Sequence, residues 1–103
     1  MDDDFIAARL TQLRTQKGCS ARDMSLSLGQ SESYINKIEN RRTLPSMTVF
    51  LYICEYLGIA PKDFFDTEAA DPKILNEIIA NLKALSPEQL SNVAAIIKDL
   101  RNR

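Results

Sequence analysis

The sequence predicts an all-α protein, and three observations support this fold class. Apolar residues recur at spacings of three and four along the chain, and no stretch shows the two-residue alternation of a strand between turn residues. Residues that favour helix starts precede these periodic segments. All three glycines directly follow such segments, where a left-handed residue ends a helix most easily without a side chain.

The first two thirds of the chain are expected to form four helices and one further helical turn. Apolar stripes and stop signals give the approximate ranges 4–17, 21–28, 32–40, 47–57 and 61–65. Ser20, followed three residues later by Asp23, resembles a capping box and opens the second helix. Ser31 can cap the third helix and Ser46 the fourth. Pro61 is preset for the first position of the last turn.

The end of the chain is expected to form two longer helices after a polar link. Asp71-Pro72 combines a cap with a proline at the first helical position, and it opens a helix over about residues 72–85. The sequence SPEQ at 86–89 then caps a last helix. We expect these two helices to form an antiparallel hairpin. This gives two domains, residues 1–66 and 67–103.

Length and composition predict a soluble globular protein with one domain, or with one compact core and an extension. The chain has 103 residues, of which 45% are apolar and 26% charged, and these are ordinary values for a folded domain. It contains no run of about 18 apolar residues. Its N-terminus is acidic rather than basic and then apolar. We therefore expect a cytoplasmic protein that is neither secreted nor associated with a membrane.

The side chains that enzymes and metal sites use are scarce. There is no histidine, and no motif of the GxSxG, GxxxxGK or HExxH type occurs. Cys19 and Cys54 are too few and too irregularly spaced for a disulfide framework, and no histidine accompanies them as a metal ligand. We expect two small buried cysteines, no catalytic residue, no metal and no cofactor, and therefore not an enzyme.

The charge distribution permits nucleic-acid binding although the formal net charge is −1. Residues 9–42 carry seven basic side chains against three acidic ones, which makes this segment locally +4. The basic residues are Arg9, Arg14, Lys17, Arg22, Lys37, Arg41 and Arg42. A local basic patch matters more to a phosphate backbone than the global sum of charges.

Two short predicted helices, 21–28 and 32–40, are joined by only the three residues 29–31. This is the spacing of a helix-turn-helix, in which the second helix enters the major groove of DNA. In that second helix Ile35 and Ile38 supply a narrow apolar stripe and leave the remaining surface polar. The same arrangement is common in helical bundles, so the spacing alone does not establish a function.

Several separated motifs between Phe5 and Asp66 resemble one family. They are LR…KG, the helix-turn-helix, YINKIEN, the LPS loop and LGI…FF. Together they are similar to the five-helix, lambda-repressor-like (Xre-type) DNA-binding domain. The resemblance implies a bacterial or phage transcriptional regulator, a repressor that binds double-stranded DNA as a homodimer. The expected fold is therefore all-α, with a five-helix lambda-repressor-like domain followed by a C-terminal two-helix hairpin.

The resemblance implies roles for individual residues in and near the third helix. Arg14 matches a first-helix arginine that pairs with a glutamate ending the recognition helix, here Glu39, and we interpret this pair as a structural tie. The positions that would face the bases are Gln30, Ser31, Glu32, Ser33, Asn36 and Lys37. Asn can pair with adenine, Lys can donate to guanine, and Ser can donate or accept. For Ser31, capping of the helix remains an alternative use of the hydroxyl.

A second set of residues is expected near the DNA backbone, where side chains hold phosphate without reading sequence. It consists of Arg22, Tyr34, Arg41, Arg42 and Thr43. Three positions depart from the family pattern. Ala21 stands where many relatives have glutamine, and Glu32 can either accept from a cytosine amino group or repel phosphate. Arg41 replaces the usual glycine, so Asn40 or Arg41 must accept the left-handed turn.

The C-terminal hairpin is expected to join two subunits, because it carries more apolar residues than one hairpin can bury against itself. The residues assigned to dimerisation are Ile74, Ile78, Leu82, Val93, Ile97 and Leu100. Two alternatives stay open. Both helices can instead pack on the core of the same monomer. The chain can also be a protein-interaction module, antirepressor-like or antitoxin-like, in which the hairpin binds another protein and the helix-turn-helix is only a scaffold.

Overall fold

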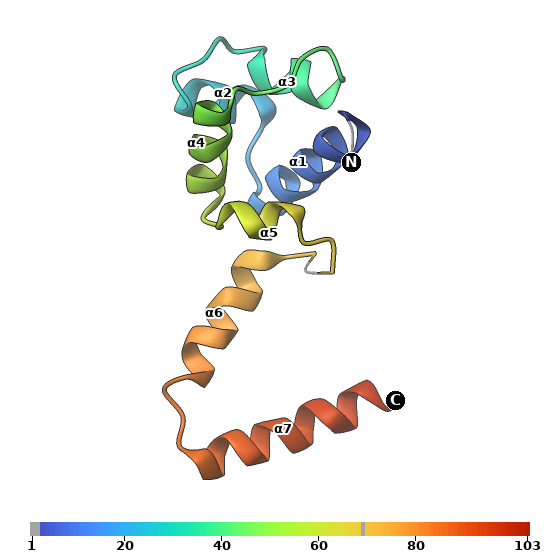
Figure 1. The fold of residues 1–103 in the computed structure, drawn as a ribbon, viewed down its shortest axis with the longest axis vertical. Helices are drawn as coiled ribbons and strands as arrows, with labels where there is room; N and C mark the ends of the chain where they lie inside the picture. Colours follow the sequence, from blue (N-terminus) through green and yellow to red (C-terminus); the bar gives the residue numbers. More distant parts are fainter. Residues whose placement is uncertain (1–2, 69) are drawn as a thin grey trace. The chain divides into compact units, whose positions relative to one another are not determined.

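The computed structural model describes residues 3–68 and 70–103, and within these ranges the chain forms seven helices and no strand. The predicted all-helical class is therefore confirmed for this part of the chain. The chain divides into two compact units, Met1–Lys73 and Ile74–Arg103 (Figure 1).

The first unit holds five helices, which follow one another from the blue to the yellow part of the ribbon in Figure 1. They are α1 (Asp3–Lys17), α2 (Ala21–Ser27), α3 (Tyr34–Glu39), α4 (Met47–Leu57) and α5 (Pro61–Phe65). Helix α3 packs against α1 and α2, and α4 packs against α1 and α5. The short α3 is therefore held between two other helices.

All five helices contribute to one apolar core. Its buried members are Leu10, Leu13, Met24, Ile35, Ile38, Phe50, Ile53, Cys54, Leu57 and Phe64. The rings of Phe50 and Phe64 meet edge to face with centroids 5.1 Å apart, an arrangement that aromatic quadrupoles favour. Because helices as short as α3 are not stable alone in water, this packing rather than local propensity determines where α3 lies.

Three helices begin at the serine caps that the sequence predicts. The Ser20 hydroxyl accepts from the Asp23 N–H at 3.0 Å, and the Ser46 hydroxyl accepts from the Val49 N–H at 3.2 Å. At the start of the last helix, the SPEQ sequence at 86–89 forms a complete capping box. Each cap satisfies a backbone N–H that lacks a partner within its own helix.

The predicted range of the third helix, 32–40, is wrong at both ends, since α3 begins at Tyr34 and ends at Glu39. The predicted side-chain cap at Ser31 is also replaced: the Ser31 carbonyl, not its hydroxyl, accepts from the Tyr34 N–H at 3.0 Å. The next N–H, that of Ile35, donates at 2.9 Å to the buried hydroxyl of Ser25 in α2. A neighbouring helix thus provides the cap.

The last two helices are α6 (Pro72–Leu82) and α7 (Pro87–Arg101). Helix α6 ends three residues before the predicted position at Leu85. Residues 83–85 instead form tight turns, in which the Ala84 and Leu85 N–H groups donate to carbonyls three residues earlier. Such hydrogen bonds to carbonyls three residues earlier are the tighter pattern with which α-helices often end.

Apolar side chains of the second unit remain largely open to solvent. Leu82, Leu85 and Val93 are half-buried near the turn that joins α6 to α7. Eight others are between 38% and 62% exposed, namely Ile74, Leu75, Ile78, Ile79, Leu90, Ile96, Ile97 and Leu100. Neither these helices nor any other helix among the described residues is long and apolar enough to cross a membrane.

Candidate nucleic-acid interface

The turn between α2 and α3 is closed by hydrogen bonds that fix the angle between the two helices. Gly29 has φ +73°, a left-handed conformation that costs little without a side chain. The Gly29 N–H donates to the Leu26 carbonyl and the Gln30 N–H to the Ser25 carbonyl, both at 3.0 Å. Ser25 adds a further link, since its hydroxyl donates to the Ala21 carbonyl at 2.7 Å while accepting from α3. Helix α2, this turn and α3 together form a helix-turn-helix.

Helix α3 has one buried side and one open side. Ile35 and Ile38 are at most 1% exposed and anchor the helix in the core. Of the six residues predicted to face bases, five are exposed, namely Ser31, Glu32, Ser33, Asn36 and Lys37. Gln30 is half-buried. The open side of α3 and the turn before it therefore carry amide, hydroxyl, ammonium and carboxylate groups within a few residues of one another.

The far end of α3 is tied to α1 by an ion pair between Arg14 and Glu39. The guanidinium donates through Nε to Oε2 at 2.7 Å and through Nη2 to Oε1 at 2.9 Å. Arg14 also donates to the Cys19 carbonyl, and the Thr11 hydroxyl donates to Glu39 at 2.7 Å. The hydrogen bond with Glu39 is the main cause that raises the pKa of Arg14. These contacts hold both members of the pair away from any ligand on the open side of α3.

Helix α3 is followed by a left-handed turn at Arg41, which has φ +63°. The Arg41 N–H donates to the Ile38 carbonyl at 3.0 Å, and the Arg42 N–H donates to the Lys37 carbonyl at 2.9 Å. This is the Schellman pattern that usually employs glycine. The sequence predicted this conformation for Asn40 or Arg41, and the structure has it at Arg41.

The residues predicted to contact phosphate surround α3. Arg22, Arg41, Arg42 and Thr43 are exposed, whereas Tyr34 is half-buried. Burial raises the pKa of the Tyr34 hydroxyl, so this hydroxyl remains a protonated donor at neutral pH. Such a set of donors can hold phosphate oxygens on either side of a groove.

Two of these cations already face a carboxylate of the same chain. Arg22 Nη2 lies 3.4 Å from Glu32 Oε2, with both side chains about two-thirds exposed. Arg41 forms an ion pair with Asp4 at the start of α1. In the described part of the chain, Lys37 and Arg42 form no salt bridge. Among the cations around α3, Lys37 and Arg42 are thus exposed and not paired with a carboxylate by any of these salt bridges.

The basic patch is smaller than the charge count of residues 9–42 suggests. Arg9 is only 4% exposed. Its guanidinium donates at 2.7 to 2.9 Å to three carbonyls at the end of α5, those of Asp63, Phe64 and Asp66. A cation suits this place because the last carbonyls of a helix lack partners and carry partial negative charge. Arg9, like Arg14, therefore serves the fold and does not extend the patch.

Sequence reasoning missed two polar residues beside this surface, Ser25 and Asn40. Ser25 is 0% exposed and links α2 to α3 as described above. The Asn40 amide donates from the end of α3 to the Asn36 carbonyl at 2.8 Å and to Asn36 Oδ1 at 2.9 Å. For Asn40 a signal was present, because residues four apart on a helix lie side by side. Nothing in the sequence marks Ser25 as the partner of a residue ten positions away.

The described residues offer no group of three histidine, cysteine or acidic side chains able to hold a metal ion. The Cys54 thiol lies in the core, and burial raises its pKa to about 11. A thiol with so high a pKa is not ionised at neutral pH and is a poor nucleophile. Cys19 is half-buried and its thiol points to the Arg14 carbonyl at 3.8 Å.

A closed turn holds the short α3 across α2, and α3 has a polar outer side with cations around it. This arrangement is the one that defines helix-turn-helix proteins. The family model for a helix-turn-helix domain matches residues 7–69, which is more than half of the chain, and the chain belongs to this family. This family suggests a regulator that binds DNA. Searches of curated proteins and of solved structures found no match to the chain.

Proposed function

We propose that this chain is a sequence-specific transcriptional regulator of the lambda-repressor-like (Xre) type, a repressor that acts in the cytoplasm and is not an enzyme. Residues 1–66 bind double-stranded DNA, and α3 lies in the major groove. The observation that carries the proposal is the open side of α3, where Asn36 and Lys37 are exposed while Ile35 and Ile38 are buried. Asn and Lys side chains match the donor and acceptor pattern of adenine and guanine edges.

The phosphate contacts in this proposal come from both sides of α3. Arg22 at the start of α2, Tyr34, and the loop residues Arg41, Arg42 and Thr43 bind the backbone and set the position of α3 along the groove. Gln30, Ser31, Glu32 and Ser33 lie at the start of the recognition segment and complete the contacts with bases. Ser31 is available for this role because the helix takes its cap from Ser25.

The regulator acts as a homodimer joined through residues 67–103, the C-terminal domain in this proposal. The eight exposed apolar side chains of α6 and α7 leave on the order of 600–700 Å² of apolar surface per chain, against about 800 Å² per partner in a standard interface. An area of this size suits a second copy of the same surface. The residues assigned to the interface are Ile74, Ile78, Leu82, Val93, Ile97 and Leu100.

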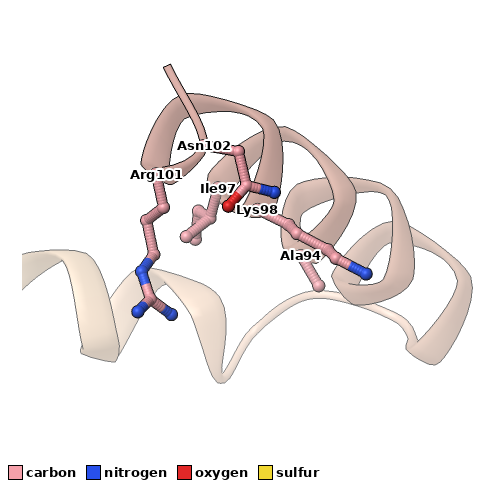
Figure 2. Close-up of a pocket in the computed structure, with 5 residues that line it drawn as sticks. All are labelled: Ala94, Ile97, Lys98, Arg101 and Asn102. Carbon is pink, nitrogen blue, oxygen red and sulfur yellow. The ribbon is translucent and has the colours of Figure 1, made fainter.

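A hollow of about 490 Å³ on α7 supports this assignment (Figure 2). Ala94 and Ile97 form its apolar part, and Lys98, Arg101 and Asn102 supply a polar rim. In this proposal, apolar side chains of the second copy lie on Ala94 and Ile97, with Lys98 and Arg101 left in water. In a dimer of this kind, two α3 helices bind half-sites about 34 Å, or ten base pairs, apart.

A salt titration with random-sequence duplex tests DNA binding. The affinity should rise as salt falls, and Arg42→Ala should weaken binding to all sequences alike and lower the log-log salt slope by about one. Lys83→Ala removes the same charge from the second unit and serves as the control. Selection from a random duplex pool then tests sequence specificity. Lack of binding to any duplex at low salt would contradict the proposal.

Sedimentation of the full-length chain tests the dimer. Ile97→Lys should shift the protein to the monomer, because a lysine on the apolar side of α7 would have to be buried in the interface. Leu26→Lys replaces a side chain that is 52% exposed on the first unit and should leave the dimer intact. A wild-type chain that sediments as a monomer at micromolar concentration would refute the dimer and leave DNA binding untouched.

A second candidate function is a protein-interaction module, antirepressor-like or antitoxin-like, with the helix-turn-helix as a scaffold. The ion pairs of Arg22 with Glu32 and of Arg41 with Asp4 favour it, because two candidate phosphate ligands are occupied by carboxylates of the chain itself. The same titration separates the two functions. A module of this kind binds no duplex at low salt, whereas exposed pairs in a DNA-binding protein exchange their carboxylate for phosphate.

A further inference from the structure

The amide group of Asn36 is hydrogen-bonded to a second amide on the open side of α3. Asn40 lies one turn further along the helix, and its Nδ2 donates at 2.8 Å to the Asn36 carbonyl and at 2.9 Å to Asn36 Oδ1. Both residues are exposed, and Asn40 is the C-cap of α3. An exposed asparagine side chain on a helix surface is usually mobile, and the hydrogen bond from Asn40 restricts this one at the candidate base-reading position.

The backbone determines which way both amides face. A carbonyl oxygen can only accept, so the Asn40 atom beside the Asn36 carbonyl must be the NH₂ group. The same NH₂ group also faces the Asn36 side chain, so the atom that it meets there must be the oxygen Oδ1. The NH₂ group of Asn36 is thereby directed away from Asn40. One backbone acceptor thus fixes the orientation of two side chains.

The groups that Asn36 retains after this contact match one base. Its Oδ1 has two lone pairs, of which Asn40 uses one, and its NH₂ group keeps both donors. The amide therefore offers one acceptor beside one donor. Adenine presents the complementary pair in the major groove, a donor at N6 and an acceptor at N7.

The backbone of Asn40 is also held in place. Its N–H donates to the Asn36 carbonyl at 2.9 Å, and the next residue, Arg41, closes the Schellman turn. In a helix the Cβ atom points toward the N-terminus, which directs the Asn40 side chain back along α3 to Asn36. The position of Asn40 thus depends on the fold and not on a ligand.

We propose that Asn40 is a positioning residue that orients the Asn36 amide for an adenine in the operator. This inference rests on the proposed function, since it requires that α3 reads bases. Asn40 itself touches no base in this account. It acts by holding Asn36 in the one orientation that pairs with adenine, so that binding does not have to immobilise a free side chain.

The test measures base preference with the full-length chain. A pool of random duplexes first yields the preferred site, and Asn36→Ala identifies the base pair whose preference depends on Asn36. Affinities are then measured for duplexes that differ only at that pair. The readout is the ratio of these affinities, which cancels any uniform effect of a variant on stability or charge.

Asn40→Ala should lower the preference at this base pair by about three- to tenfold, and preferences at other positions should stay within about twofold. Asn40→Asp should lower it at least as much, because its carboxylate cannot donate and draws the Asn36 NH₂ group toward itself. Asn92→Ala is the control: Asn92 is an exposed asparagine of α7 that is assigned to no base, phosphate or dimer contact, and its loss should leave the ratio unchanged.

The possible failures are distinguishable. A wild-type chain that selects no sequence contradicts the proposed function and this inference together. If the wild type selects a site and Asn36→Ala alters no single base pair, the regulator stands and the inference is wrong. The inference is equally wrong if Asn40→Ala leaves the preference of the Asn36 base pair intact, or weakens the preference equally at every position as a general loss of helix order would.

Discussion

Removal of the Glu39 carboxylate should lower the unfolding free energy of the first unit by more than the loss of an exposed ion pair would. The side chains of Arg14 and Glu39 are only 18% and 11% exposed. In Glu39→Ala the guanidinium keeps its bond to the Cys19 carbonyl but loses both carboxylate bonds. A cation left without its partner in a mostly buried place is expensive.

The magnitude follows from this burial. Removal of one partner from a fully buried pair costs about 3–5 kcal/mol, because the remaining charge is left uncompensated. Water can reach the exposed fifth of Arg14, so we expect about 2–3 kcal/mol in the free energy of unfolding. For a domain of this size that corresponds to a fall of roughly 10–20 °C in the melting temperature.

Thermal and urea denaturation followed by far-ultraviolet circular dichroism measure this effect. The double variant Arg14→Met, Glu39→Leu should be more stable than Glu39→Ala, because it leaves no unpaired charge. Glu32→Gln, which breaks an exposed pair of the same unit, should change stability by less than about 0.5 kcal/mol. If Glu39→Ala lowers the unfolding free energy no more than Glu32→Gln does, the Arg14–Glu39 pair behaves as a surface pair and the reasoning is refuted.

Three further predictions concern the core and the charged surface. Ser25→Ala should cost about 1–3 kcal/mol in unfolding free energy, since the Ile35 N–H loses its acceptor; Ser25→Thr retains an acceptor and tests whether the hydroxyl or the small size matters. Asp4→Asn should tighten binding to random duplex about two- to fivefold by releasing Arg41, whereas Asp99→Asn, with the same change in charge, should not. The folded pKa of Cys54, about 11, exceeds its ordinary value of 9.0. The protonated thiol therefore stabilises the fold fully below pH 9, and this stabilisation is lost as the pH rises to 11. Over that range, the unfolding free energy of Cys54→Ala should fall by about 2–3 kcal/mol less than that of the wild type. Equal slopes for wild type and variant would contradict the assignment.

Local signals predicted the helices well, because each depends on a few adjacent residues. The caps at Ser20 and Ser46 and the proline starts at Pro61 and Pro72 need only their own segment of chain. The end of α6 was predicted three residues too late, since no glycine follows this helix to mark its end.

Contacts between helices account for what the sequence did not predict. The cap of α3 comes from Ser25 in α2, and Arg9 turns inward to the carbonyls at the end of α5. Neither of these two contacts produces a periodic pattern in the sequence. The charge count therefore gave a larger basic patch than the one that Lys37, Arg42 and their neighbours present. The roles assigned to DNA-facing residues, and dimerisation through the second unit, stay predictions.

The left-handed conformation of Arg41 sets backbone stability against charge at one position. A side chain there costs about 1 kcal/mol relative to glycine, so the most stable version of this turn would have no side chain at all. Arg41→Gly should therefore melt at a higher temperature than Arg41→Ala while lacking the same cation. If Arg41 binds phosphate as proposed, the loop after α3 gives up about 1 kcal/mol of stability for a cation beside the recognition helix.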